Sequence, residues 1–257
     1  MQVIESSTNA FGGVLPKPAA LSHDPDVFRQ QLFHSLEAWK RDGFLVVWLE
    51  IPITKSSVIP VAVDAGFVFH HSSDDYLMLT CRLVEDAFIP VHATHYIGAG
   101  GVVLNDKQEL LVVCEKYRGA GRPPYYKLPG GALHPGEHLV EGVVREVFEE
   151  TGVPTRFDAL VCLRHWHGYR YGKSDIYFVC RLVPLHQDIA MQLSEIEECR
   201  WMPVEEYFNA ETVSSFNKHI VQTAMTSPGF MPTWIEGYAD PKKYEFFMPV
   251  DGERQEQ

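Results

Sequence analysis

The segment from Gly131 to Val153 limits the possible fold more than any other part of the chain. Apolar residues recur there every three or four positions, as on one face of an α-helix. At 100° per residue, three carboxylates fall together on the other side of the helix, namely Glu146, Glu149 and Glu150. The segment therefore predicts an amphipathic helix from about Leu139 to Glu150. Its apolar half holds Leu139, Val140, Val143, Val144, Val147 and Phe148.

Three carboxylates on one helix face repel one another, and the helix dipole disfavours them near the C-terminus. A hard divalent cation such as Mg²⁺ or Mn²⁺ is the natural counter-charge, because it prefers carboxylate oxygens. Gly142 leaves room for a metal and a phosphate against the helix, and Arg145 is placed to pair with Glu149 at i+4. The alternative interpretation of the three glutamates alone is a solvated acidic face.

The overall charge narrows the choice of partner. The chain has 257 residues and a formal net charge of −12. This acidic balance disfavours binding to a nucleic-acid polymer, but it does not exclude a small phosphate-containing substrate, because bound cations invert the local charge. The sequence has no CxxC pair, no signal-peptide pattern and no long apolar run. We therefore expect a cytoplasmic protein with free thiols and no membrane partner.

The order of the expected elements predicts two units. Residues 1–22 look like a flexible leader, and residues 23–91 like a small α/β domain. The elements expected in that domain are a helix over 24–42, a strand over 44–51, a helix from 56 or 57 to 65, and strands over 67–71 and 75–84.

The order of elements expected over residues 92–230 predicts an α+β unit, a layered arrangement of strands and helices. We expect two strands, 95–105 and 109–116, to pair through a turn at Asn105-Asp106. The central helix is followed by strands over 157–166, 175–185 and 199–202 and by helices near 203–208 and 214–226. Residues 231–257 then form a C-terminal extension.

The spacing inside the central segment is more specific than its helical pattern. It matches G-x5-E-x7-R-E-U-x-E-E-x-G-U, with U aliphatic, at every specified position, and so resembles the box of the Nudix hydrolase superfamily. The matching residues are Gly131, Glu137, Arg145, Glu146, Val147, Glu149, Glu150, Gly152 and Val153. The resemblance implies an α/β/α sandwich with a mixed sheet, over residues of about 94–210.

The resemblance also implies a reaction and a set of roles. Members hydrolyse a nucleoside diphosphate linked to another group, with Mg²⁺ or Mn²⁺ activating the attacking water. By position in the box, Glu146 and Glu150 would be metal ligands, Glu149 a ligand or water-orienting base, and the Gly131 carbonyl a further ligand. The catalytic set would thus be Glu146, Glu149, Glu150 and Arg145, while Arg145 and Glu137 hold the loop and helix together and Gly152 completes the box.

Other segments resemble one subgroup of this superfamily. WLEIP, GFVFHH, GKSDIYFVCRL and EIEECRWM are similar to plant cytosolic ADP-ribose/NADH pyrophosphatases and to the vertebrate Nudix protein encoded antisense to a fibroblast growth factor gene. In that subgroup a small α/β domain precedes the Nudix domain. ADP-ribose is therefore the first expected substrate and NADH the second, and a homodimer is expected.

Candidate substrate-binding residues lie on both sides of the box. Arg118, Arg122 and Lys127 form a basic stretch that leads into the Gly-Gly turn, where they would attract a pyrophosphate. Tyr169 lies in an aromatic stretch suited to stacking on adenine, and Glu195 is a carboxylate beyond the box. For each of these, a solvated surface position is the alternative.

Two other functions stay open at this point. One is an enzyme that removes oxidised nucleotides or other nucleoside diphosphates. The other is a nucleotide-binding or regulatory protein that keeps the fold without turnover. The complete set of Glu146, Glu149 and Glu150 argues against the second, because loss of these carboxylates marks a non-catalytic copy.

Overall fold

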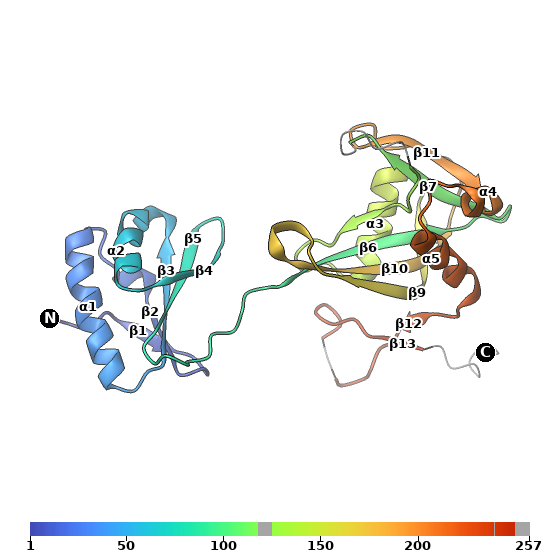
Figure 1. Cartoon of the computed structure of the whole chain (residues 1–257). Helices are drawn as coiled ribbons and strands as arrows, with labels where there is room; N and C mark the ends of the chain where they lie inside the picture. Colours follow the sequence, from blue (N-terminus) through green and yellow to red (C-terminus); the bar gives the residue numbers. More distant parts are fainter. Residues whose placement is uncertain (118–124, 239, 250–257) are drawn as a thin grey trace. The chain divides into compact units, whose positions relative to one another are not determined.

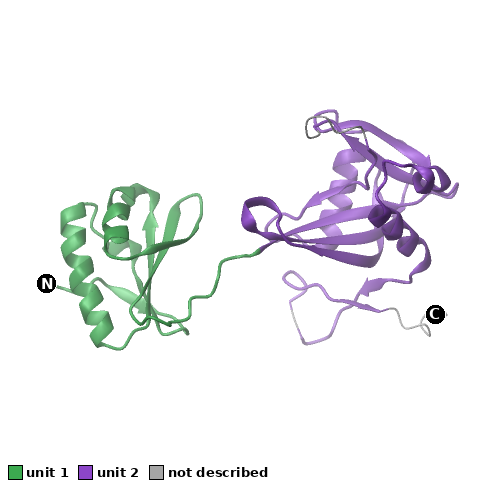
Figure 2. Cartoon of the chain, viewed as in Figure 1, with its two compact units in different colours: residues 1–94 green, residues 95–257 purple. Residues whose placement is uncertain are grey.

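The chain divides into two compact units in the computed structural model, which describes residues 1–117, 125–238 and 240–249. Unit 1 is Met1–Thr94 and unit 2 is His95–Gln257 (Figure 2). The division lies close to the boundary expected between residues 91 and 92. Each unit has its own hydrophobic core.

Unit 1 is a five-stranded sheet in the order β1-β2-β3-β5-β4, with two α-helices (Figure 1). The helix over 24–42 is confirmed as α1, and the sequence shows why it starts where it does. Asp24 accepts hydrogen bonds from the backbone N–H groups of Asp26 and Val27, and Pro25 occupies the first helical position. The elements are β1 (Ser6–Thr8), β2 (Gly13–Pro16), η1 (Pro18–Ala20), α1 (Pro25–Arg41), β3 (Val46–Pro52), η2 (Ile53–Val58), α2 (Ile59–Asp64), β4 (Val68–Ser72) and β5 (Tyr76–Arg82).

The expectation of a flexible leader over residues 1–22 is wrong. This segment supplies strands β1 and β2, and Ile4, Val14 and Leu21 are buried in the core of unit 1. The ammonium group of the buried Lys55 donates to the carbonyls of Pro18 and Leu21, at 2.8 and 2.6 Å. Because β2 pairs in parallel with the distant strand β3, no local pattern in this polar segment reveals the pairing.

Unit 2 contains a six-stranded mixed sheet in the order β13-β12-β9-β10-β6-β8, and a separate pair, β11-β7. Among the strand pairings described for unit 2, only β6 and β10 run parallel; the others are antiparallel. The elements are β6 (His95–Val103), β7 (Glu109–Glu115), β8 (Gly130–Ala132), α3 (Leu139–Thr151), β9 (Thr155–Trp166), η3 (Arg170–Gly172), β10 (Ser174–Pro184), β11 (Ile196–Pro203), α4 (Val204–Asn209), α5 (Ser215–Thr226), β12 (Phe230–Pro232) and β13 (Phe247–Pro249).

The six-stranded sheet is covered on both faces, as the α/β/α expectation requires. In β6, Val102 packs in the core with helix α5, whereas its neighbour Val103 packs in the core with helix α3. Successive residues of a strand point to opposite faces, so α3 and α5 cover opposite sides of the sheet (Figure 1). Leu110 and Leu111 of β7 divide between the same two cores.

Both expected strands, β6 and β7, exist, and their expected pairing is confirmed only beside the turn at Asn105-Asp106. The pair is joined by the isolated bridge between Leu104 and Leu110, while β6 lies beside β10 and β7 beside β11. Both strands are apolar on both faces and therefore belong inside the layered core. Their neighbours are then chosen by packing of distant segments, which a turn at Asn105-Asp106 does not determine.

The segment expected as a C-terminal extension contributes to unit 2 as far as it is described. Strand β13 pairs with β12, which joins the sheet at β9, and the rings of Phe247 and Phe157 lie 5.9 Å apart. Across the described ranges, none of the helices combines the length and the apolar character that crossing a bilayer requires.

The burial of the first residues leads to a stability prediction. Ile4→Ala should lower the free energy of unfolding of unit 1 by about 2–3 kcal/mol, because it leaves a cavity in the core. Native-state hydrogen exchange of the β3 amides would measure this change for unit 1 alone. Phe11→Ala is the matched control, since Phe11 belongs to the same segment and is half exposed. Equal effects of the two substitutions would contradict the placement of this segment in the core.

Candidate active site

Helix α3 holds the three glutamates of the box, and both of its ends are fixed. At its start, His138 occupies the cap position without a side-chain cap of its own. The carboxylate of Glu245, from the C-terminal segment, accepts hydrogen bonds from the N–H groups of Leu139 and Val140 at 2.6 and 3.3 Å. At its end, Gly152 has a φ of 72°, a left-handed conformation that glycine adopts without strain.

The side chain of Arg145 connects the loop that precedes α3 to the helix. Its guanidinium donates twice to Glu137, at 2.6 and 2.9 Å, and once to the carbonyl of Ala132 at 3.2 Å. The same group donates to Glu146 at 3.0 Å and to Glu149 at 2.9 Å, the i+4 pair that the spacing predicts. These bonds lower the pKa of the Glu137 carboxyl to about 2, so this carboxylate stays ionised at neutral pH.

The third glutamate has different surroundings. Glu150 is buried, and its carboxylate accepts a hydrogen bond from the N–H of Gly130 at 2.8 Å. Burial raises its pKa, and this rise is opposed by the Lys127 ammonium 3.7 Å away and by the Gly130 N–H. Although burial by itself lowers the pKa of Lys127, its neighbours Glu150 and Glu115 raise it overall. The Lys127–Glu115 distance is 2.5 Å.

The backbone at Gly130 and Gly131 lies directly against two of the glutamates. A Cβ atom built on Gly131 would overlap the carboxylate of Glu146, so a side chain at this position would displace that carboxylate. Carboxylate oxygens beside a backbone carbonyl form an all-oxygen donor set, which suits Mg²⁺ or Mn²⁺ in kind. In the ranges that the structure covers, no three His, Cys, Asp or Glu side chains already converge as a cation site. The carboxylates bond instead to Arg145, Lys127 and the Gly130 N–H.

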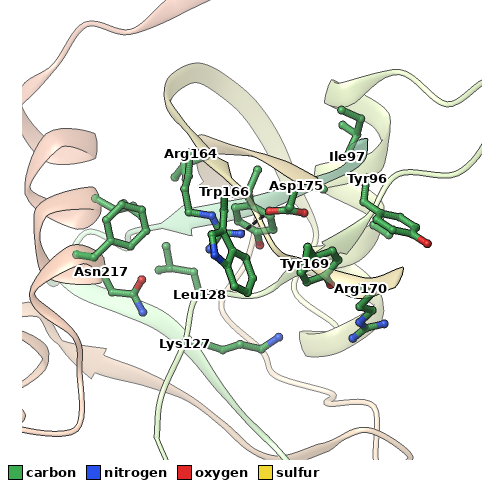
Figure 3. A pocket seen from close by; sticks show the side chains of 18 of the residues that line it. Tyr96, Ile97, Lys127, Leu128, Arg164, Trp166, Tyr169, Arg170, Asp175 and Asn217 are labelled. Atoms are coloured by element: carbon green, nitrogen blue, oxygen red, sulfur yellow. Dashed lines mark hydrogen bonds and ion pairs between the residues drawn. The ribbon is translucent and has the colours of Figure 1, made fainter. Parts of the chain in front are cut away.

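A cavity of about 650 Å³ opens beside this glycine pair. Gly130, Gly131 and Lys127 line one part of it, and the aromatic residues Tyr96, Trp166 and Tyr169 line another (Figure 3). The volume falls in the range of pockets that bind small molecules and cofactors. The cavity thus places an aromatic surface and a lysine ammonium in reach of one ligand.

The aromatic part of the cavity is formed where β9 ends and β10 begins. Trp166 and Tyr169 pack edge to face at 5.4 Å, and Tyr169 packs in the same way on Tyr96 at 5.6 Å. The guanidinium of Arg164 lies over the Trp166 ring at 5.5 Å and bonds to the buried carboxylate of Asp175 at 2.5 Å. Figure 3 shows this ion pair next to Trp166. The interlocked rings make a firm wall for a planar ligand.

Comparison with known protein families agrees with this geometry. A NUDIX domain model matches residues 94–224, and a second model, described as a Nudix hydrolase domain, matches residues 4–83. The chain belongs to the Nudix hydrolase family. The second match covers unit 1, including most of the segment that the sequence analysis assigned to a leader.

Three relatives show where this Nudix hydrolase lies in the family. It is 40% identical over 220 residues to Nudix hydrolase 2 of Arabidopsis thaliana, covering 83% of this chain and 77% of that protein. It is 38% identical over 207 residues to Nudix hydrolase 8 of the same plant, covering 80% and 56%. The human protein Nucleoside diphosphate-linked moiety X motif 6 is 31% identical over 227 residues, covering 85% and 71%. These plant and vertebrate relatives confirm the expected subgroup.

The chain therefore spans little more than half of Nudix hydrolase 8, at 56% of its length.

The substrate-binding candidates from the sequence have different outcomes. Lys127 and Tyr169 both line the cavity. Glu195 is exposed, lies in the turn before β11, and is not among the described residues that line the cavity. Arg118 and Arg122 lie outside the described residues.

Sequence reasoning missed several residues of this Nudix site. Three of them lie in or beside the aromatic stretch that holds Tyr169, namely Arg164, Trp166 and Asp175. No local pattern in the sequence distinguishes the residues of this stretch that line the cavity from those that do not. Tyr177 was missed altogether. The glycines of β6 are visible in the sequence, but their position opposite Tyr177 depends on the pairing of β6 with β10, which no local pattern predicts.

The cap on α3 leads to a second stability prediction. Glu245→Ala should lower the free energy of unfolding of unit 2 by about 1 kcal/mol, because two backbone N–H groups lose their acceptor. Urea unfolding followed by hydrogen exchange of the α3 amides would measure the loss. Glu236→Ala is the control, since Glu236 is an exposed residue of the same C-terminal segment. A Glu245→Ala variant as stable as Glu236→Ala would show that the cap contributes nothing.

Proposed function

We propose that this Nudix hydrolase cleaves the pyrophosphate bond of a nucleoside diphosphate linked to another moiety, with ADP-ribose as the first substrate and NADH as the second. The products from ADP-ribose would be AMP and ribose 5-phosphate. The proposal rests on the hydrolase family, on the plant and vertebrate relatives, and on the name of the human relative, which refers to such a linked moiety.

One observation supports this proposal most directly. The cavity of about 650 Å³ reaches from aromatic side chains to the Gly130–Gly131 backbone, which lies against Glu150 and Glu146. A base stacked at the aromatic part would leave its phosphates near Lys127 and the glutamates. The lining therefore combines aromatic rings with a lysine and with the backbone beside the glutamates, the two kinds of surface that a nucleoside diphosphate needs.

The roles proposed for the residues follow from their positions in the Nudix box. Glu146, Glu150 and the Gly131 carbonyl would hold Mg²⁺ or Mn²⁺, with Glu149 as a further ligand or as the group that orients water. The bound ion would supply positive charge for the phosphoryl oxygens and lower the pKa of a bound water. Lys127 would attract the pyrophosphate, and Arg145 would keep the glutamates in place through Glu137.

Substitution of Glu150 tests the catalytic part of the proposal. Glu150→Gln should lower kcat by about 100-fold or more in the presence of Mg²⁺, because a charged oxygen ligand of the metal is lost. Steady-state release of AMP from ADP-ribose would measure kcat, and circular dichroism would check that the fold is kept. The control is Glu141→Gln, on an exposed face of the same helix. Near-normal turnover by Glu150→Gln would reject the assignment.

Substitution of Lys127 tests the binding part. Lys127→Met should raise KM about tenfold at low salt, the cost of roughly one charged hydrogen bond. The rise should shrink as ionic strength increases, since the attraction is electrostatic. Lys107→Met, in an exposed turn of the same unit, is the matched control. An unchanged KM for Lys127→Met at low salt would remove Lys127 from the binding site.

A substrate panel decides between the proposed function and its alternatives. ADP-ribose, NADH, oxidised nucleoside triphosphates and other nucleoside diphosphate sugars would be compared with Mg²⁺ and with Mn²⁺, by identity of the products. Preference for an oxidised nucleotide would favour a sanitising enzyme. Absence of hydrolysis across the panel would favour a nucleotide-binding protein.

A further inference from the structure

Tyr177 of strand β10 occupies a space that three glycines leave open. It lies beside Gly98 in the parallel pairing of β10 with β6. A Cβ atom on Gly98 would come within 3.0 Å of the Tyr177 ring, and one on Gly100 within 2.9 Å. A Cβ on Gly130 would lie 2.8 Å from the Tyr177 hydroxyl oxygen. Any other residue at these positions would displace the ring, so the glycines fix where it lies.

The ring is also held from a further direction. The guanidinium carbon of Arg164 lies 5.3 Å from the centre of the Tyr177 ring, within the range of a cation–π contact. Arg164 is itself bound to the buried Asp175, so its position is determined by an ion pair. A side chain packed in this way keeps its orientation without help from a ligand.

The hydroxyl of Tyr177 lies where this rigid ring meets the glutamates. It is next to Gly130, whose N–H donates to Glu150 at 2.8 Å. Tyr177 also lines the cavity, together with Lys127 and Gly131. Tyr177 is partly buried, and among the described residues no hydrogen-bond partner of its hydroxyl is found. The cavity is the direction from which a partner can come.

The hydroxyl keeps its proton at physiological pH. Burial raises the pKa of Tyr177 well above its usual range, and the nearby Glu150 carboxylate acts in the same direction. A neutral phenol can donate one hydrogen bond to an anion. Phosphoryl oxygens are strong acceptors, and they gain charge when a pyrophosphate is hydrolysed.

We propose that the Tyr177 hydroxyl donates a hydrogen bond to a non-bridging oxygen of the substrate pyrophosphate and is thus a further catalytic residue of this site. The inference rests on the proposed function, because it requires a pyrophosphate beside Gly130. No proton is transferred in this role; the hydroxyl stabilises charge on the phosphoryl oxygen while Lys127 provides the neighbouring positive charge. The alternative is a purely structural ring that fills the space above the glycines.

Tyr177→Phe separates these two roles, because it keeps the ring and removes the hydroxyl. We expect kcat to fall about 10- to 100-fold, as for loss of one donor to a developing anion, with an unchanged melting temperature. The matched control is Tyr207→Phe in α4, whose hydroxyl is buried, has no partner among the described residues and does not line the cavity. Turnover of Tyr177→Phe equal to that of Tyr207→Phe would overturn the inference.

A binding measurement keeps this test separate from the proposed function. The probe is α,β-methylene-ADP, which cannot be hydrolysed at its bridging carbon. Calorimetry in the presence of Mg²⁺ should show that it binds at least fivefold more weakly to Tyr177→Phe than to the wild-type chain. If the wild-type chain hydrolyses a diphosphate and the variant matches it in turnover and binding, only the inference about Tyr177 fails. If the wild-type chain hydrolyses no diphosphate, the proposed function fails and calorimetry alone decides on Tyr177. In that case, the role of Tyr177 is rejected if the analogue binds equally to both chains. It is also rejected if the analogue does not bind to the wild-type chain.

Discussion

The guanidinium of Arg145 is the interaction on which the arrangement of the site depends. It joins Glu137 and the Ala132 carbonyl, in the loop before α3, to Glu146 and Glu149 on the helix itself. Without a cation at this point, two carboxylates one turn apart would repel each other at the end of the helix where the dipole also disfavours them. One side chain therefore fixes the loop and makes the acidic face tolerable.

The remaining acidic side chain is stabilised in another way. Glu150 is buried and depends on a backbone N–H and on Lys127, which it shares with Glu115. Both sets of contacts lie along the Gly130–Gly131 backbone, which approaches the helix closely because it has no side chains. The acidic net charge of the chain is thus offset locally by a few basic groups. A divalent ion and a phosphate would enter a site whose charges are already partly balanced.

The sequence predicts the helix of the site and the identity of its charged residues, because those depend on spacing within one segment. The positions of β9, β10 and β11 are also predictable, since long apolar strands have a local pattern. The neighbours of strands are not predictable in this way, because β6 and β7 meet only beside their turn and pair along their lengths with β10 and β11. Two strands of three and four residues at the start of the chain were missed for the same reason. Tyr177 and Arg164 become part of the site only because β10 pairs with both β6 and β9.

Residues near both ends of the described chain stabilise the fold. Ile4 and Val14 belong to the core of unit 1, and Glu245 and Phe247 belong to the support of α3 and its sheet. Trimming the termini is a common first step when a protein is prepared for crystals or fused to a reporter. Here such trimming would remove a sheet strand at one end and the helix cap at the other, so tags and fusions are better joined before Ile4 or after Pro249.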